Sequence, residues 1–195
     1  KDLEADLNKQ GYVLGHYPQS MDIAQMGGLV STNSIGQFST GYGGIEDLLL
    51  GLTVVLPNGE IVLLKSNPRK ATGPDLRHLF LGGEGFIGII TEVTVKIFPT
   101  PEARWKGSYR VKSMEDGLTI IRNVMRAGIK PSVVRIHDWL ECEKPYGAFM
   151  EEGEALLLFL TEGVKEVTET QGKLIDRIAL ENNGIAAGEK PVDIW

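Results

Sequence analysis

Two glycine-rich segments hold most of the residues whose types could bind a ligand. The first runs from Pro18 to Gly36 and combines Gly27-Gly28 with hydroxyl and amide side chains at 31–34. Glycine has no side chain and tolerates positive φ, so backbone N–H groups can lie bare against a phosphate or a flat ring. Serine, threonine and asparagine add short hydrogen-bonding groups without bulk. The segment therefore has the composition of a binding surface for a large polar cofactor.

The second segment, Gly82–Gly88, repeats this composition and leads directly into an apolar run. A phosphate alone needs only one such loop, so two loops indicate a longer cofactor. The alternative interpretation is that the glycines, 24 among 195 residues, mark the corners of a β-rich domain. The order of a lone helix, a small-residue loop, a hairpin and a second loop favours the cofactor.

A third group of candidate residues lies in the strand-like run 131–138. Arg135 and His137 are two residues apart, so they share one face of that strand. An arginine there can bind the phosphate or carboxylate of a substrate through two parallel hydrogen bonds. The alternative is a rim arginine paired with Asp138 or Glu141. His137 is a weaker candidate, since it is more simply interpreted as a surface histidine than as a catalytic base.

Metal and thiol chemistry find little support in the sequence. The three histidines, at 16, 78 and 137, lack the spacing of metal ligands, so we predict no metal site. We expect His16 and His78 to pack in the interior or to face solvent. The single cysteine, Cys142, excludes an intramolecular disulfide framework, and its two glutamate neighbours disfavour a thiolate.

Charge and hydropathy narrow the class of partner. A net charge of −6 and a pI near 5.2 argue against nonspecific binding to nucleic acid. No apolar run reaches transmembrane length, so we expect a cytoplasmic or membrane-peripheral protein whose targeting signals lie outside this sequence. The chain starts inside a charged helix without an initiator methionine and stops at Trp195 after a loop. We therefore interpret it as an internal piece of a longer protein.

The elements that position the two glycine-rich segments follow from periodicity and capping. Residues 1–10 predict a helix that ends at Gly11, and the turn Asn58-Gly59 predicts a hairpin over 52–65. A short helix should follow Asp75, which can cap it. The strand 89–98 should bury alternate side chains, namely Ile89, Thr91, Val93, Val95 and Ile97. The prolines at 99 and 101 end this strand and mark the predicted domain boundary.

The residues after Pro101 predict a second unit. Strands over 105–111, 131–136 and 155–160 alternate with helices over 113–128 and 164–180. The helices should bury Met114, Leu118, Ile121 and Met125 in the first and Val167, Leu174, Ile175 and Ile178 in the second. The wholly apolar strand 155–160 should be central. This β-α-β-β-α order resembles the split βαβ, ferredoxin-like unit.

The motifs of the first hundred residues keep a characteristic order. They are Gly11-Tyr12, Gly15-His16, Pro18-x-Ser20, Gly27-Gly28, Ser31-Thr32, Tyr42-Gly43, Ile45–Leu48, Thr72–Asp75, Glu84–Glu92 and Pro99–Pro101. Together they are far more specific than any single glycine pattern. In this order the chain resembles the FAD-binding domain of the vanillyl-alcohol oxidase type of flavoproteins, and it is most similar to the alkyldihydroxyacetonephosphate synthase branch.

The resemblance implies an α+β fold with two domains. Residues 1–101 would form the second, C-terminal part of a PCMH-type FAD-binding domain, a mixed sheet with helices whose N-terminal phosphate-loop part is missing. Residues 102–195 would form a ferredoxin-like α+β cap, or substrate, domain that is incomplete at its C-terminus.

The resemblance also implies FAD as the cofactor and distributes its contacts over both glycine-rich segments. The pyrophosphate and isoalloxazine side would meet Pro18, Gln19, Ser20, Met21, Ala24, Gly27 and Gly28, continued by Thr32, Asn33 and Ser34. The adenosine half would meet Glu84, Gly85, Gly88, Ile89 and Ile90. Two residues depart from the usual pattern. Asn33 stands where the synthases often have arginine, and Phe86 replaces a threonine, so that an aromatic ring could pack on adenine.

Three functions are open at this point. The synthase branch exchanges an acyl for an alkyl group on dihydroxyacetone phosphate through a flavin adduct, and its arginine matches Arg135. The alternative is an FAD-dependent dehydrogenase or oxidase of a 2-hydroxy acid such as lactate or glycolate, favoured by the short run 146–154. A third is a non-catalytic binding module.

Both enzymes would act on a small molecule, a phosphorylated ketone ester or a 2-hydroxy acid, and either could form a homodimer. The reactive tyrosine and histidines of the synthases would lie beyond Trp195. This chain alone should therefore be inactive.

Overall fold

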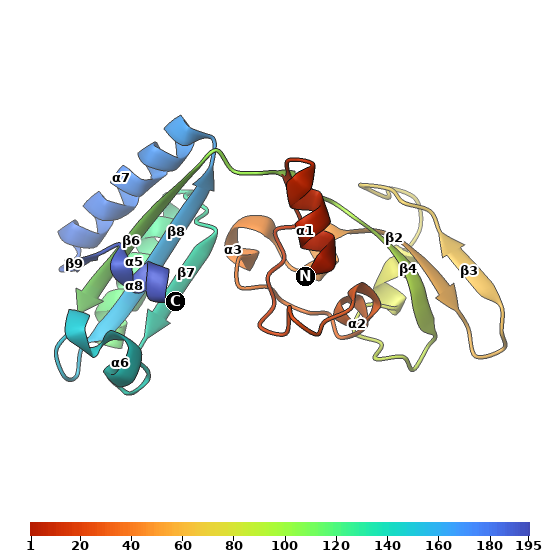
Figure 1. The fold of residues 1–195 in the computed structure, drawn as a ribbon, viewed down its shortest axis with the longest axis horizontal. Helices are drawn as coiled ribbons and strands as arrows, with labels where there is room; N and C mark the ends of the chain where they lie inside the picture. The colour runs from red at the N-terminus through yellow and green to blue at the C-terminus, as the bar shows by residue number, and fades with distance from the viewer. The chain divides into compact units, whose positions relative to one another are not determined.

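The computed structural model describes all residues from Lys1 to Trp195. The chain forms two compact units, Lys1–Thr100 and Pro101–Trp195, and Figure 1 labels most of their elements. Both units combine helices with sheet, and every strand pair is antiparallel. The α+β fold class is therefore confirmed. None of the helices has both the length and the apolar surface needed to cross a bilayer.

The first unit is built from short elements. Its helices are α1 (Asp2–Lys9), α2 (Met26–Ser31), α3 (Ser39–Tyr42), α4 (Ile45–Leu48) and the 3-10 turn η1 (Leu76–Leu79). Its strands are β1 (Tyr12–Val13), β2 (Leu49–Val55), β3 (Ile61–Leu64), β4 (Ile89–Val95) and β5 (Phe98–Pro99). Strand β1 pairs with β5, while β3, β2 and β4 form a three-stranded sheet in that order.

Local signals set several of these boundaries as expected. Gly11 follows α1 with a φ of +80°, the left-handed conformation that ends many helices. The hairpin β2–β3 turns at Asn58-Gly59, where Gly59 has a φ of +83°. The Asp75 carboxylate accepts a hydrogen bond from the Arg77 N–H and so caps η1. These three predictions are confirmed.

A bulge in β4 makes the predicted alternation wrong. Thr53 of β2 pairs with Glu92, but the next residue, Val54, pairs with Ile90, so Thr91 is an extra residue in β4. An extra residue moves the side chains beyond it to the opposite face. Ile90 therefore packs on the core together with Val93, whereas Ile89 is 68% exposed.

The second unit has a regular topology. In chain order it contains β6 (Ala103–Val111), α5 (Met114–Arg126), β7 (Val133–His137), α6 (Trp139–Tyr146), the 3-10 turn η2 (Gly147–Phe149), β8 (Ala155–Gly163), α7 (Lys165–Glu181), β9 (Ile185–Gly188) and α8 (Lys190–Ile194). The sheet order is β7-β8-β6-β9. This βαββαβ arrangement is ferredoxin-like, and β8 is an inner strand as predicted.

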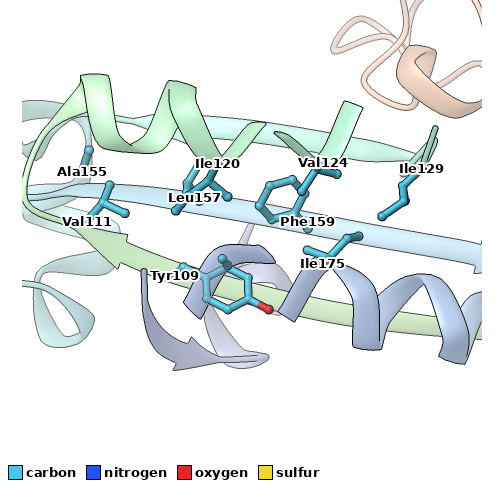
Figure 2. Close-up of a cluster of buried hydrophobic side chains, with 10 residues drawn as sticks. Tyr109, Val111, Ile120, Val124, Ile129, Ala155, Leu157, Phe159 and Ile175 are labelled. Atoms are coloured by element: carbon cyan, nitrogen blue, oxygen red, sulfur yellow. The ribbon is translucent and has the colours of Figure 1, made fainter. Parts of the chain in front are cut away.

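The core of this unit lies between the sheet and its two long helices. Figure 2 shows Ile120 and Val124 of α5 and Ile175 of α7 packed with Leu157 and Phe159 of β8. Helix α5 begins where the Ser113 side chain accepts a hydrogen bond from the Asp116 N–H and so caps the helix, within the range expected from the sequence.

The predicted inward faces of both helices are partly wrong. Met114, Leu118 and Met125 of α5 and Val167 of α7 are exposed. Glycines explain the difference, because a side chain at Gly117 would collide with Ile136, and one at Gly172 with Trp105. Each helix approaches its sheet at the glycine, and the buried stripe follows from that contact rather than from the count of apolar residues.

Candidate functional site

The two glycine-rich segments meet at the C-terminal end of α2. The Gly82 N–H donates to the Val30 carbonyl at 3.2 Å, and the Glu84 N–H donates to the Ser31 carbonyl at 2.9 Å. The last carbonyls of a helix have no partner within the helix, so the second loop satisfies two of them. The structure thereby brings Glu84 and Gly85 next to the segment that contains Thr32, Asn33 and Ser34.

The backbone is strained at this junction. Three non-glycine residues in the chain have positive φ, and two of them are Asn33 at +48° and Glu84 at +44°. Gly82 and Gly85, on either side of Glu84, are also left-handed, at +67° and +81°. Left-handed backbone costs non-glycine residues free energy, and such residues gather at ligand clamps and active sites. The junction is therefore a candidate binding site.

A pocket of about 330 Å³ lies at the other end of α2. Its wall comes from the first turn of α1, from the start of α2 and from the segment between them. Three residues predicted to bind the cofactor, Pro18, Met21 and Ala24, line it. Gln19 is exposed outside the lining, and Ser20 forms a turn by accepting the Ala24 N–H through its carbonyl at 2.8 Å.

A buried glutamate holds the wall of this pocket together. The Glu4 side chain accepts a hydrogen bond from the Leu14 N–H at 3.0 Å and another from the Tyr17 hydroxyl at 2.9 Å. These bonds fix α1 against the strand β1 and the residues that lead to Pro18. A buried carboxylate is stable only when it is paired in this way. Glu4 therefore positions one side of the pocket rather than reaching into it.

His16 packs in the interior, one of the two positions expected for it, but the sequence did not assign it to the cofactor site. It is 2% exposed and lines the pocket; its Nε2 lies 3.4 Å from the Ser34 hydroxyl, and its Nδ1 has no hydrogen-bond partner. Burial lowers the pKa of His16, although the nearby Glu46 acts in the opposite direction. The ring is therefore neutral at neutral pH, and its unpartnered Nδ1 faces Gly36, where an added side chain would lie 3.1 Å from it. The sequence signals were its place two residues before Pro18 and its membership of the Gly15-His16 motif.

The predicted glycines divide into two kinds. A side chain at Gly27 would lie 3.0 Å from the Ile90 carbonyl oxygen, and one at Gly88 would lie 2.7 Å from Val54. These glycines permit close packing of α2 and of the second loop on the sheet. By contrast, no atom lies within 4 Å of the position that a side chain would occupy at Gly28 or Gly85. Their backbone is bare, as close contact with a ligand requires.

In the second unit, Arg135 has no ion-pair partner. Its guanidinium lies over the Trp195 ring, 5.4 Å from the centroid. The two carboxylates proposed as partners are engaged elsewhere. Asp138 accepts the Glu141 N–H at 2.9 Å and caps α6, while Glu141 pairs with His137. The structure thus presents Arg135 as a cation held by an aromatic ring, with its hydrogen-bond donors free for an anion.

His137 lies on the same face of β7 as Arg135. Its Nδ1 is 2.8 Å from Glu141 Oε2, and its ring lies 5.9 Å from the Tyr146 ring, between centroids. Its Nε2 is buried without a hydrogen-bond partner. Because the Glu141 carboxylate accepts a hydrogen bond from Nδ1, the ring proton lies on Nδ1 and the lone pair of Nε2 is free. This lone pair could accept a hydrogen bond or a proton from a bound molecule.

Cys142 is unsuited to nucleophilic chemistry, in agreement with the sequence analysis. It is fully buried in α6, and burial, with Glu141 and Asp138 nearby, raises the pKa of its thiol to about 11. No three histidine, cysteine or acidic side chains gather anywhere in the chain as a metal site would need.

Comparison with known proteins connects these features to flavin enzymes. A family model described as an FAD binding domain matches residues 1–65. The protein of Escherichia coli named uncharacterized FAD-linked oxidoreductase YgcU is 45% identical over 90% of this chain and 36% of its own length. The alkyldihydroxyacetonephosphate synthase of Caenorhabditis elegans is 40% identical over 71% of this chain and 23% of its own length.

The fold is similar to that of a solved relative. A crystal structure of an alkyldihydroxyacetonephosphate synthase superposes with a TM-score of 0.85 and 25% sequence identity, over 96% of this chain and 38% of that one. The chain therefore spans only 23–38% of the length of these relatives.

Proposed function

Since the chain belongs to the FAD-linked oxidoreductases that carry this FAD binding domain, we propose that it functions within an enzyme resembling alkyldihydroxyacetonephosphate synthase. FAD is the cofactor of this family. The reaction would replace the acyl group of an acyl-dihydroxyacetone phosphate by a fatty alcohol, without net oxidation. The observation that carries the proposal is the unpaired Arg135, because the substrate of this reaction is an anion.

The residues of the first unit fit a flavin dinucleotide. Its pyrophosphate needs bare backbone, which Gly28 and Gly85 offer, and its polar ring edge needs hydrogen-bonding groups such as the exposed side chains of Thr32 and Asn33. When bound, FAD supplies the electron-accepting ring. The chain's own residues would hold that ring in place and exclude water from it.

Each predicted group would then have a defined task. Pro18, Met21 and Ala24 would pack against the cofactor in the pocket, with His16 as a neutral hydrogen-bonding partner. Gly28 and the residues 32–34 would follow the pyrophosphate with their backbone. Glu84 and Gly85 would hold the far end of the cofactor. Gly27, Gly88 and Ile90 would support these contacts through packing.

Arg135 would bind the substrate phosphate through two of its N–H groups. The Trp195 ring limits the rotation of the guanidinium and so reduces the entropy lost when the anion binds. His137 would add a hydrogen bond beside the anion, or accept a proton, through Nε2.

A 2-hydroxy acid is the second candidate substrate. Its carboxylate would meet Arg135 in the same way, with its hydroxyl toward His137. The connection between α6 and β8 is short, since only η2 and five further residues, at 150–154, lie between the two elements. It favours this candidate because the family resemblance implies a longer insertion at this place in the synthases. The chemistry of the two substrates differs in one measurable respect, since only the 2-hydroxy acid would be oxidised.

The test is an anaerobic titration of the full-length gene product. We expect its flavin absorbance to bleach with an acyl-dihydroxyacetone phosphate and to recover when a fatty alcohol is added. Bleaching only with D-lactate or glycolate would instead assign the dehydrogenase. Bound flavin that responds to neither class, or no flavin, would leave a binding module and contradict the proposal.

Two matched variants test whether substrate binding needs Arg135 itself or only a positive charge on the protein. Arg135→Gln should require about 10- to 150-fold higher substrate concentrations for the same bleaching, since hydrogen bonds to a charged group contribute about 1.5–3 kcal/mol. Arg122→Gln, an exposed arginine on α5, should leave bleaching unchanged.

A further inference from the structure

Phe86 is the most exposed large apolar side chain of the chain, at 92%. Single exposed apolar residues are common on protein surfaces, so exposure alone assigns no role. The position of Phe86 is what distinguishes it. The residue belongs to the second glycine-rich segment, directly after the left-handed Glu84 and Gly85.

The backbone that carries Phe86 is fixed. The Phe86 N–H donates to the Gly83 carbonyl at 2.7 Å, and Gly82 and Glu84 are bonded to the end of α2. The ring is therefore presented by an anchored loop, although no side chain covers it. A partner that stacks on such a ring loses little entropy in ordering it.

An exposed stripe of α2 connects this loop with the pocket. Gln25, Gly28 and Thr32 are spaced three and four residues apart, which places them on one side of the helix, and all three are exposed. Gln25 lines the pocket, and Thr32 lies at the junction with the second loop. Six helical residues span about 9 Å. The stripe is thus a short, bare path between the two places.

The cofactor is longer than the pocket. A volume of about 330 Å³ is near the lower end of the roughly 300–1,000 Å³ of ordinary ligand sites. FAD has two ring systems joined by a pyrophosphate, so one ring system must lie outside the pocket. The reacting ring is assigned to the pocket because Pro18, Met21 and Ala24, which the proposed function places on the isoalloxazine side, line it. The purine then lies toward the second loop.

We propose that Phe86 is the stacking platform for the purine ring of FAD. This inference rests on the proposed FAD-dependent function and adds a residue that determines the choice between dinucleotide and mononucleotide. A phenyl ring has no hydrogen-bond donor, so it contributes affinity by stacking alone. FMN lacks the purine and gains nothing from Phe86.

The test compares two flavins on three variants. The flavin-free protein is titrated with FAD and with FMN by calorimetry, as Phe86→Thr, as Phe86→Trp and as Ile61→Thr. We expect Phe86→Thr to weaken FAD about 5- to 150-fold, the range for one base stacked on an aromatic side chain, and to leave FMN unchanged. Phe86→Trp should retain FAD affinity. Ile61→Thr, another exposed apolar residue on β3, should match the unsubstituted protein.

Three outcomes would overturn the inference in different ways. Unchanged FAD affinity in Phe86→Thr would show that the purine lies elsewhere. An equal loss for FAD and FMN would mean that the ring contacts the isoalloxazine or supports the loop. If the unsubstituted protein binds neither flavin, the proposed function itself fails. Because Phe86 is exposed, its variants should melt at the same temperature as the unsubstituted protein, which excludes misfolding as the cause.

Discussion

The two candidate sites differ in the groups that they offer to a ligand, backbone in one and side chains in the other. In Lys1–Thr100 the site is backbone, held in left-handed conformations at Asn33 and Glu84 around the bare glycines Gly28 and Gly85. In Pro101–Trp195 it is side chain, with Arg135 and His137 on a regular strand. A backbone site should therefore be sensitive to added bulk and to lost supports, whereas a side-chain site should be sensitive to lost charge.

The largest expected effect in the unit that carries the backbone site comes from Arg77. This side chain forms an ion pair with Asp75 and donates from Nη1 to the carbonyls of Leu49, Leu50 and Asn67 at 2.7–2.9 Å. Arg77→Ala leaves a half-buried carboxylate unpaired and should lower the free energy of unfolding by about 3 kcal/mol. Urea unfolding followed by circular dichroism measures this. Arg69→Ala, an exposed neighbour, should change it by less than about 0.5 kcal/mol.

The same ion pair predicts a dependence of stability on pH. The hydrogen bonds from Arg77 lower the pKa of Asp75 to about 2, against about 3.9 in an unfolded chain. A group whose pKa is lower in the folded state stabilises fully above its unfolded pKa. That contribution is lost as the pH falls from about 4 toward 2. Arg77→Ala should have a shallower loss of stability across this window, and an identical slope would contradict the assignment.

The side-chain site should respond to the removal of one charge. Arg135→Gln should raise the KM for the anionic substrate about 10- to 150-fold, since hydrogen bonds to a charged group contribute about 1.5–3 kcal/mol. Arg135→Lys should lie between, because it keeps the charge but loses the two-pronged contact. Bound flavin should not change. A KM equal to that of the Arg122→Gln control would exclude Arg135 from substrate binding.

A single methyl group should distinguish bare backbone from packed backbone. Gly28→Ala places a methyl in open space on a helix, so it should raise the stability of the flavin-free protein by up to about 1 kcal/mol. The same methyl should weaken FAD by about tenfold if the cofactor contacts this backbone. Gly147→Ala, an equally open glycine in the second unit, is the control. Improved stability with full FAD affinity would remove Gly28 from the site.

The smallest expected effect concerns Cys142. Because burial raises its pKa to about 11, the thiol should not react with a disulfide reagent at pH 8 until the protein is unfolded in urea. Cys142→Ala should leave flavin binding unchanged. Reaction of the native protein at the rate of the unfolded protein would show that α6 opens readily.

Much of the fold could be predicted from local sequence. Turn and cap residues such as Asn58, Asp75 and Ser113 act within a few residues, so their signals are readable without tertiary contacts. The inward faces of α5 and β4 could not be predicted in the same way. They depend on a glycine contact with Ile136 and on the extra residue Thr91, and both are properties of the packed sheet rather than of the segment.

The candidate sites show the same division. The glycine-rich segments were evident from composition, because bare backbone requires small residues. The pocket residue His16 was not, since its unpartnered nitrogen depends on what the fold places around it. For Arg135, the sequence left two equal alternatives. The fold decides between them, because Asp138 and Glu141 are engaged with other groups.

The central claim is that the two glycine-rich segments form the binding surface for FAD. Calorimetric titration of the flavin-free, full-length gene product with FAD tests it most directly, with Gly28→Ala and Gly147→Ala beside it. The account predicts stoichiometric binding that Gly28→Ala weakens and Gly147→Ala does not. Binding that is indifferent to both substitutions, or no binding at all, would contradict it.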